Sequence, residues 1–149
     1  MERTLVILKP DAVQRGLIGE ILHRLERRGL RLAALKFAPI SRELAARHYA
    51  EHEGKPFYPG LIDYITSGPV VLAVFEGKNA VATVRTTMGV TNPANAAPGT
   101  IRGDLAVETG RNLIHGSANL DDAAREVSLF FPPDEVHTWD RTTERWIAE

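Results

Sequence analysis

The segment TLVILKPDAVQRGLIGEILHRLERRG, residues 4–29, contains the first strand and the first helix of the expected fold. Residues 4–8 are apolar and rich in β-formers, which is typical of a buried strand, and Lys9-Pro10-Asp11 ends it. Apolar residues then recur at positions 18, 21, 22 and 25, the spacing of an amphipathic helix, and Gly29 is placed to stop that helix. The segment therefore predicts a strand followed by a helix that covers it.

The rest of the chain continues this alternation of elements. Further strands are expected over residues 30–40, 69–75 and 113–115, and further helices over 41–52, 60–66, about 81–88 and 119–131. Residues 54–59 and 91–102 are predicted to be loops because they are rich in proline and glycine. The order predicts an α+β fold, a ferredoxin-like βαββαβ sandwich with an antiparallel sheet covered by helices. We interpret residues 1–149 as one domain with a C-terminal tail from about residue 132.

The helix after residue 119 has its own start signal and buried side. Asn119 is suited to cap it, with Asp121 and Asp122 in the first turn, where the helix dipole favours carboxylates. The apolar positions expected to face the core are Leu120, Ala123, Ala124, Val127 and Phe131.

The composition excludes several classes of protein. The chain has 149 residues, 44% of them hydrophobic and 25% charged, a net charge of −1 and no cysteine. Without a basic excess there is no support for non-specific nucleic-acid binding, and without cysteine there is no disulfide framework or thiolate metal site. No apolar run reaches the length of a membrane span, and the N-terminus has no signal-peptide pattern, so we expect no membrane association and a cytoplasmic location.

His115 is the first candidate for a nucleophile. It lies in RNLIHGS, residues 111–117, between an apolar pair and a Gly-Ser turn, so that a short strand would hold it with one side open. A neutral imidazole is nucleophilic when one ring nitrogen is fixed and the other points at the target. Glu126 on the following helix is placed to fix it. The alternatives are a structural histidine and an exposed helix glutamate, which are the commoner roles for such residues taken singly.

Basic residues at structural breaks suggest anion binding. Lys9, Arg85, Arg102 and Arg111 lie at strand ends or near loop mouths, where guanidinium and ammonium groups can converge on phosphate oxygens. Arg102 stands out because glycines on both sides permit a close approach of backbone and ligand. The alternative for each is solvated surface charge.

Other residues offer weaker signals. There is no Walker A sequence and no G-x-G-x-x-G motif. His48 and His52 are four residues apart on one predicted helix, but without a third ligand they are interpreted as a polar helix face, and no metal ligands are predicted on the protein. Tyr49 and Phe57 flank the loop at Gly54, either as packing residues or as a hydroxyl donor and a stacking platform.

At this point the chain closely resembles the nucleoside diphosphate kinase family over essentially its whole length. The resemblance rests on residues 4–16 with Lys9-Pro10-Asp11, and on 55–57, 66–71, 91–93, 98–104 and 112–117. The last two segments, at this spacing, are the most specific. The resemblance implies transfer of the γ-phosphate of a nucleoside triphosphate to a nucleoside diphosphate by a ping-pong mechanism through a phosphohistidine.

The resemblance also implies residue roles. His115 matches the nucleophile, attacking through Nδ1, and Glu126 matches the carboxylate that holds the other ring nitrogen. Lys9 and Tyr49 match donors to the transferring phosphoryl group, and Ser117 matches a hydroxyl beside the histidine. The nucleotide-binding residues implied are Arg85, Thr91 and Arg102 for the phosphates, Asn112 and Lys9 for the sugar, and Phe57 and Leu61 for the base.

The implied ligands are ATP, GTP and other nucleoside di- and triphosphates, with Mg²⁺ carried in by the nucleotide phosphates rather than by an acidic cage. One stacking contact implies little base selectivity, because every base has a π-face. The implied assembly is a homohexamer, with a tetramer as the alternative because Ala148 replaces an aromatic residue of the C-terminal tail. Ala118-Asn119 also departs from the Asp-Ser of many members.

Two other functions compete with the kinase. One is a catalytically silent nucleotide-binding module on the same fold, because a fold alone does not grant a function. The other is a histidine phosphocarrier, which would not require Phe57, Asn112 and two nucleotide-binding arginines. The completeness of the residue set favours the kinase.

Overall fold

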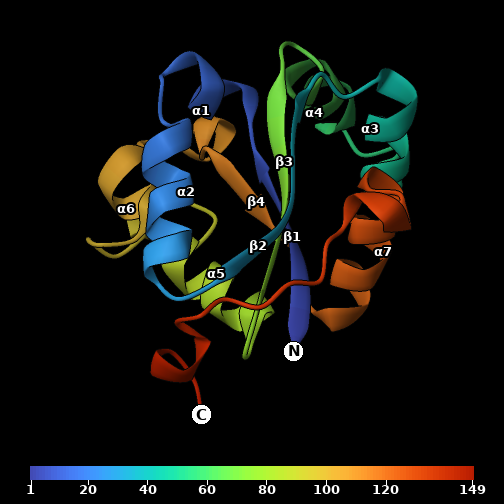
Figure 1. Ribbon diagram of the computed structural model, residues 1–149. Helices are drawn as coiled ribbons and strands as arrows, with labels where there is room; N and C mark the ends of the chain where they lie inside the picture. Colours follow the sequence, from blue (N-terminus) through green and yellow to red (C-terminus); the bar gives the residue numbers. More distant parts are fainter.

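The computed structural model describes residues 1–149 and has a four-stranded antiparallel sheet in the order β2-β3-β1-β4 (Figure 1). The strands are β1 (Glu2–Leu8), β2 (Arg31–Ala38), β3 (Val70–Gly77) and β4 (Ile114–Gly116). This strand order, with the first and third strands central, confirms the predicted antiparallel α+β sandwich.

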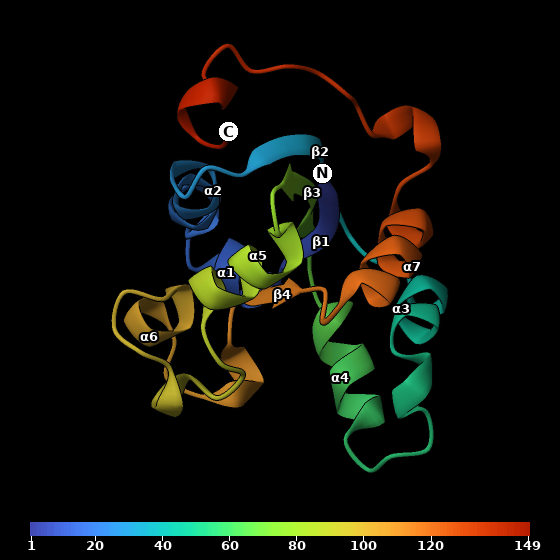
Figure 2. The same ribbon diagram turned by 90° about the horizontal axis from the view of Figure 1, so that it is seen from below.

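Helices cover both faces of the sheet. They are α1 (Pro10–Gln14), α2 (Ile18–Arg27), α3 (Arg42–His48), α4 (Tyr58–Ile65), α5 (Ala80–Met88), α6 (Ile101–Leu105) and α7 (Leu120–Phe130). Short 3₁₀ helices lie at Ala50–His52, Pro93–Asn95, Thr109–Arg111, Pro133–Glu135 and Glu144–Trp146. Helices α1, α2, α5 and α6 lie to one side of the sheet, and α3, α4 and α7 lie to the other (Figures 1 and 2). No helix combines the length and the apolar character needed to cross a membrane.

Strand β1 supplies both halves of the core. Val6 and Leu8 pack into the cluster beneath α2 and α5, whereas Leu5 and Ile7 pack into the cluster beneath α3, α4 and α7. All four side chains are fully buried. A strand covered on both faces needs apolar residues at every position, which explains why residues 4–8 form a continuous apolar run instead of alternating.

Two short helices were not expected from the sequence. Residues 10–14 form α1, which begins with proline at its first position, where the missing N–H costs nothing. The predicted loop over 91–102 ends early because Thr100 caps α6 by accepting a hydrogen bond from the Gly103 N–H. The predicted helix over 41–52 also divides, since α3 ends at His48 and a 3₁₀ turn follows.

Helix α7 buries a different set of residues from the one predicted. Asn119 caps the helix as expected, by accepting from the Asp122 N–H at 2.8 Å. Leu120 and Ala124, however, are exposed, so this part of the prediction is wrong. Glu126 is 4% exposed and takes one of the inward positions. A buried carboxylate on the core side of a helix needs hydrogen-bonding partners, which points to a site rather than to packing.

The C-terminal tail runs along the edge of β2 (Figure 2). The His137 N–H donates to the Ala33 carbonyl at 2.9 Å, and Trp139 Nε1 donates to the Leu32 carbonyl at 2.8 Å. Arg141 Nη2 donates to the Gly29 carbonyl at 2.8 Å. These bonds satisfy backbone groups that would otherwise be open at the start of an edge strand.

Two glycines give a matched test of the close packing around α6. A Cβ at Gly103 would overlap the Ala97 carbonyl oxygen and lie 2.8 Å from Thr100 Oγ1, whereas a Cβ at Gly19 in α2 would meet nothing within 4 Å. We expect Gly103→Ala to lower the free energy of unfolding by about 1–3 kcal/mol through overpacking. Gly19→Ala should raise it by about 0.5–1 kcal/mol through helix propensity. Urea unfolding measures both, and equal effects of the two substitutions would contradict this packing.

Candidate functional site

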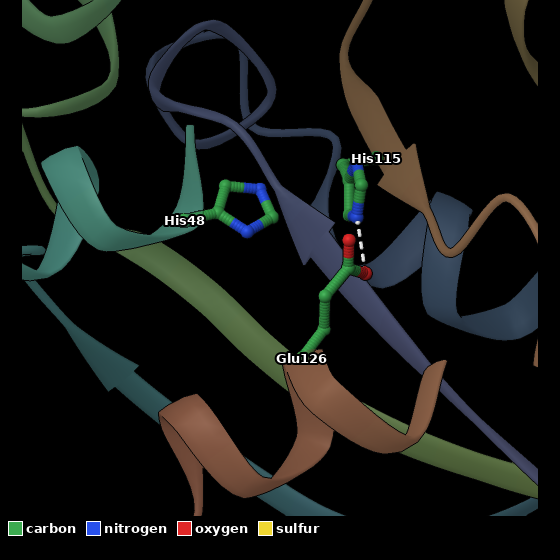
Figure 3. A group of neighbouring side chains, drawn as sticks. All are labelled: His48, His115 and Glu126. Carbon is green, nitrogen blue, oxygen red and sulfur yellow. Dashed lines mark hydrogen bonds and ion pairs between the residues drawn. The ribbon is translucent and has the colours of Figure 1, made fainter. Parts of the chain in front are cut away.

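The centre of the site is His115, held on β4 opposite Ile7 of β1. Its Nε2 lies 2.8 Å from Oε1 of Glu126 on α7 (Figure 3). Ser117 Oγ donates to the same oxygen at 2.7 Å and accepts from the Leu5 N–H at 3.2 Å. The three side chains thus form one hydrogen-bonded unit that is anchored to the central strand.

The charge of Glu126 decides which nitrogen of His115 carries the proton. Burial raises the pKa of the Glu126 carboxyl, but the hydrogen bonds and charge of His115 and the Ser117 hydroxyl outweigh it, so that the pKa lies below its ordinary value. An ionised carboxylate only accepts, so Nε2 is the protonated nitrogen and Nδ1 keeps the lone pair. The His115 side chain is 21% exposed, which gives a reactant access to the ring.

A second group of polar residues lies where β1 ends. Lys9 Nζ donates to Asn112 Oδ1 at 2.8 Å, and Asn112 Nδ2 donates to the Thr91 carbonyl at 3.0 Å. Burial, with a smaller contribution from the charge of Arg102, lowers the pKa of the Lys9 ammonium to about 8, although Asp11 opposes the shift. Burial destabilises the positive charge of Lys9, and a bound anion would stabilise that charge.

Arg102 is more deeply built into the fold than its sequence context suggests. It is 4% exposed, and its guanidinium donates to the carbonyls of Asn112 at 3.1 Å, Gly89 at 3.0 Å and Ile114 at 2.6 Å. Burial and the neighbouring Arg85 lower its pKa to about 10. Three of its five N–H groups therefore hold backbone, which leaves two for a ligand.

Arg85 brings another cation close to the histidine. It is exposed on α5, and its Nη1 donates to the Gly116 carbonyl at 3.3 Å, directly after His115 in the chain. This contact fixes one end of the guanidinium and leaves the rest of the group free for an anion.

An unusual turn sets the direction of the segment before His115. Leu113 has a φ of 74°, the left-handed region that non-glycine residues seldom adopt. Asp11 holds this turn by accepting from the Leu113 N–H at 3.1 Å and from the Tyr64 hydroxyl, and the Lys9 N–H donates to the Leu113 carbonyl at 2.8 Å. Such a conformation costs about 1–3 kcal/mol and persists only where the surroundings enforce it. The sequence reasoning missed the roles of Asp11 and Tyr64.

The residues predicted to contact the base lie on the α3–α4 side. Phe57 is 53% exposed, and Leu61 is one helical turn later, with its N–H donating to the Phe57 carbonyl at 3.0 Å. The Phe57 ring lies 5.3 Å from the His52 ring, which lies 6.2 Å from the Tyr49 ring. Burial, with the charge of Glu126, raises the pKa of the Tyr49 hydroxyl to about 12, so it remains a donor at neutral pH. An aromatic row thus runs from the exposed Phe57 toward the histidine.

His48 corrects a prediction from the sequence. It was expected on a polar helix face, but it is 5% exposed and its ring lies edge-on to His115, with 4.9 Å between ring centroids. Its helix faces the core, so the i, i+4 relation to His52 is incidental. Single ligand atoms of His48, His115 and Glu126 all lie within 4.8 Å of one another, which the chain's spacing did not reveal.

Comparison with known proteins agrees with this arrangement. The sequence model described as "Nucleoside diphosphate kinase" matches residues 2–136. A nucleoside diphosphate kinase of Archaeoglobus fulgidus is 58% identical over 149 residues, covering 100% of this chain and 99% of that protein, and one of Thermomicrobium roseum is 59% identical over 147 residues, covering 99% of each. The structure of a halophilic nucleoside diphosphate kinase from Halobacterium salinarum in complex with CDP is similar with a TM-score of 0.97 and 54% identity, over 99% of each chain. The chain belongs to the nucleoside diphosphate kinase family.

Proposed function

We propose that His115 Nδ1 attacks the γ-phosphorus of a nucleoside triphosphate in a two-step transfer. The P–O bond to the β-phosphate breaks, a nucleoside diphosphate leaves, and phosphohistidine remains. A second nucleoside diphosphate then takes the phosphoryl group through its terminal oxygen and restores the imidazole. Family membership makes the chain a nucleoside diphosphate kinase. The observation that carries the residue assignment is the 2.8 Å contact of Nε2 with Glu126, because it leaves Nδ1 as the nucleophile.

The environment of His115 suits each change of charge. The ring becomes positive as the N–P bond forms, and the buried Glu126 carboxylate stabilises that charge through the proton on Nε2. Ser117 keeps Glu126 in place by its second hydrogen bond to Oε1. On the phosphate side, Lys9, Arg85 and Arg102 neutralise the oxygens, with the Tyr49 and Thr91 hydroxyls as further donors. Positioning and neutralisation are the main requirements of phosphoryl transfer.

We assign the sugar to Asn112 and Lys9, and the base to Phe57 and Leu61. Asn112 and Lys9 already hydrogen-bond each other at 2.8 Å, so a sugar hydroxyl would enter an existing polar pair. The exposed Phe57 ring offers a face to any base, and stacking is tolerant of base identity. The relative from Halobacterium salinarum was solved in complex with CDP, which supports pyrimidine nucleotides as ligands of this chain. Broad use of purine and pyrimidine substrates follows from this assignment.

Mg²⁺ is part of the proposal, carried by the nucleotide. Two carboxylates of the site are engaged within the protein, Asp11 by Leu113 and Tyr64 and Glu126 by His115 and Ser117. The residues around the phosphates are instead cationic, which suits a phosphate-bound Mg²⁺ that keeps several waters. When bound, the ion neutralises phosphate charge and orients the transferring group.

We also propose a homohexamer, with a tetramer as the alternative, in the cytoplasm. Leu35 and Phe37 on β2 are 50% and 60% exposed, and Val107 and Trp146 are 86% and 78% exposed. Exposed large apolar side chains on the edge strand, after α6 and near the C-terminus are characteristic of surfaces that bury against another subunit.

The first test is labelling of the histidine. Incubation with a nucleoside triphosphate labelled at the γ-phosphate should give a phosphoenzyme that is labile in acid and stable in base. His115→Gln should carry no label, while His137→Gln, in the exposed tail, should carry the wild-type amount. Circular dichroism is the check that both variants fold. Undiminished labelling of His115→Gln would refute the covalent mechanism.

The second test uses pH. Because the pKa of Lys9 is about 8, the free enzyme loses this positive charge as the pH rises through that value, and kcat/KM should fall with an apparent pKa near 8. In Lys9→Arg the charge is retained and the fall should move to much higher pH. Lys78→Arg, on the exposed surface, should leave the profile unchanged. An unaltered alkaline limb in Lys9→Arg would show that another group titrates.

The third test separates the two roles of Arg102. Lysine keeps the charge, but its ammonium cannot replace the planar guanidinium that donates to three carbonyls. Arg102→Lys should therefore lower the free energy of unfolding by about 1–3 kcal/mol and also lower turnover. Arg85→Lys should lower turnover with little change in stability, because Arg85 is exposed and makes a single carbonyl contact. Thermal melting and steady-state kinetics measure both. Wild-type stability in Arg102→Lys would contradict the structural role of the guanidinium.

A further inference from the structure

His48 has a chemical requirement that the phosphoryl-transfer mechanism does not meet. The residue is 5% exposed, and neither Nδ1 nor Nε2 has a hydrogen-bond partner within the protein. A buried polar group without a partner costs about 1–3 kcal/mol, and such groups are rare in folded proteins. The His48 ring packs against three other rings, with centroid distances of 4.9 Å to His115, 4.5 Å to Tyr49 and 5.3 Å to Phe130. An imidazole lone pair is therefore held in the interior without a protein group to bind it.

The His48 ring lies beside two other side chains that can bind a metal ion, His115 and Glu126. One atom each of His48, His115 and Glu126 fall within 4.8 Å of one another, and the side chains converge from α3, β4 and α7 (Figure 3). Two imidazoles and one carboxylate are a ligand set that zinc uses in catalytic sites, where the fourth position remains open to water. His115 is partly exposed, so an ion has a route to the cluster.

We propose that His48, His115 and Glu126 form an inhibitory site for a divalent transition-metal ion of the zinc type. Closing the cluster around an ion requires movements of about 1 Å, because zinc–nitrogen and zinc–oxygen bonds of about 2.0–2.2 Å place ligand atoms closer together than 4.8 Å. Side-chain rotation supplies this movement without a change in the strand or helices that carry the residues.

The ion would act through the proton of His115. In the free site Nε2 is protonated toward Glu126 and Nδ1 holds the lone pair. A metal ion can bind Nε2 only after the proton there has moved through solvent to Nδ1, which leaves the Nε2 lone pair for the ion and keeps one proton on the ring. Nδ1–H has no lone pair to attack phosphorus. The metal therefore inhibits by imposing the opposite tautomer, and this part of the inference rests on the proposed role of His115 as nucleophile.

The ligand chemistry distinguishes this ion from the Mg²⁺ of the substrate. Imidazole nitrogen suits zinc, cobalt and nickel, whereas Mg²⁺ prefers oxygen ligands and retains water. Arg125, whose Nη2 lies 3.6 Å from Glu126 Oε2, repels every divalent cation alike, so the selectivity comes from the two imidazole ligands. The site is thus selective for nitrogen-seeking ions and is not a store for Mg²⁺.

Binding is tested first with Co²⁺ as a spectroscopic substitute and without nucleotide. The wild-type protein should develop the intense visible bands of four-coordinate Co²⁺ at one ion per chain, and Zn²⁺ should displace them. His48→Gln should weaken Co²⁺ binding by at least about tenfold. His23→Gln, which removes an exposed histidine on α2, should bind as the wild type does. Absence of these bands in the wild type, or equal binding by His48→Gln, overturns the site.

A measurement on the wild type alone guards against misfolding of His48→Gln. In ¹⁵N NMR of the histidine rings, one equivalent of Zn²⁺ should shift the ring nitrogens of His48 and His115 together and leave those of His23 in place. Zn²⁺ that shifts only exposed histidines overturns the proposal.

Inhibition is tested by single-turnover labelling with Mg²⁺ and a labelled triphosphate. Protein loaded with Zn²⁺ should form phosphohistidine at least about tenfold more slowly than metal-free protein, while His48→Gln keeps its own metal-free rate within about twofold. A metal-free wild type that forms no phosphohistidine would instead refute the proposed function, independently of the Co²⁺ result. Bound Zn²⁺ with an unchanged labelling rate overturns the inhibitory role.

Discussion

The hydrogen bond between His115 Nε2 and Glu126 Oε1 is the constraint on which the site depends. It joins β4 to α7 across 2.8 Å, and Ser117 extends it to the backbone of β1. A carboxylate buried on the core side of a helix would destabilise the fold if it were unpaired, so the helix, the edge strand and the central strand are placed correctly only together. The same bond fixes the tautomer of the imidazole and therefore its chemistry.

The phosphate side of the site depends on a second constraint, the left-handed turn at Leu113. Asp11 holds the N–H of this turn and Arg102 holds the carbonyls of Asn112 and Ile114 on either side of it. Arg102 thus has a structural role and, in our proposal, a ligand-binding role in the same guanidinium. A fold that uses its cations to secure backbone delivers them to a substrate in a fixed orientation, which limits the reorganisation needed during transfer.

The cluster around His48 follows from these two constraints. Once His115 is turned toward Glu126, its ring presents an edge to His48, and the aromatic packing of Tyr49 and Phe130 closes the remaining space. The nitrogen atoms of His48 are then buried by packing rather than by hydrogen bonding. The transition-metal site that we propose beside His115 is consistent with this arrangement, since groups that orient an imidazole can also be metal ligands.

Local pattern was sufficient to predict most of the elements and to select the main candidates for site residues. The apolar run at residues 4–8, the helical spacing from Ile18 to Leu25 and the cap at Asn119 depend only on neighbours in the chain. The short helices α1 and α6 were not predicted because five residues are too few to show helical periodicity. His115, Glu126, Lys9 and Arg102 were candidates from their local context, and the resemblance to a family implied their roles without describing the geometry of the site.

The sequence by itself determined the order of the four strands and the longer helices, the absence of thiol chemistry and the family, because these depend on composition, periodicity and motif spacing. Only the tertiary structure decided that Glu126 faces inward, that Arg102 holds three carbonyls and that His48 is buried beside His115. These facts depend on contacts between segments far apart in the chain. Contacts between distant segments decide whether a polar side chain is buried, which partners it hydrogen-bonds and which of its atoms carries the proton. No single stretch of sequence contains these contacts.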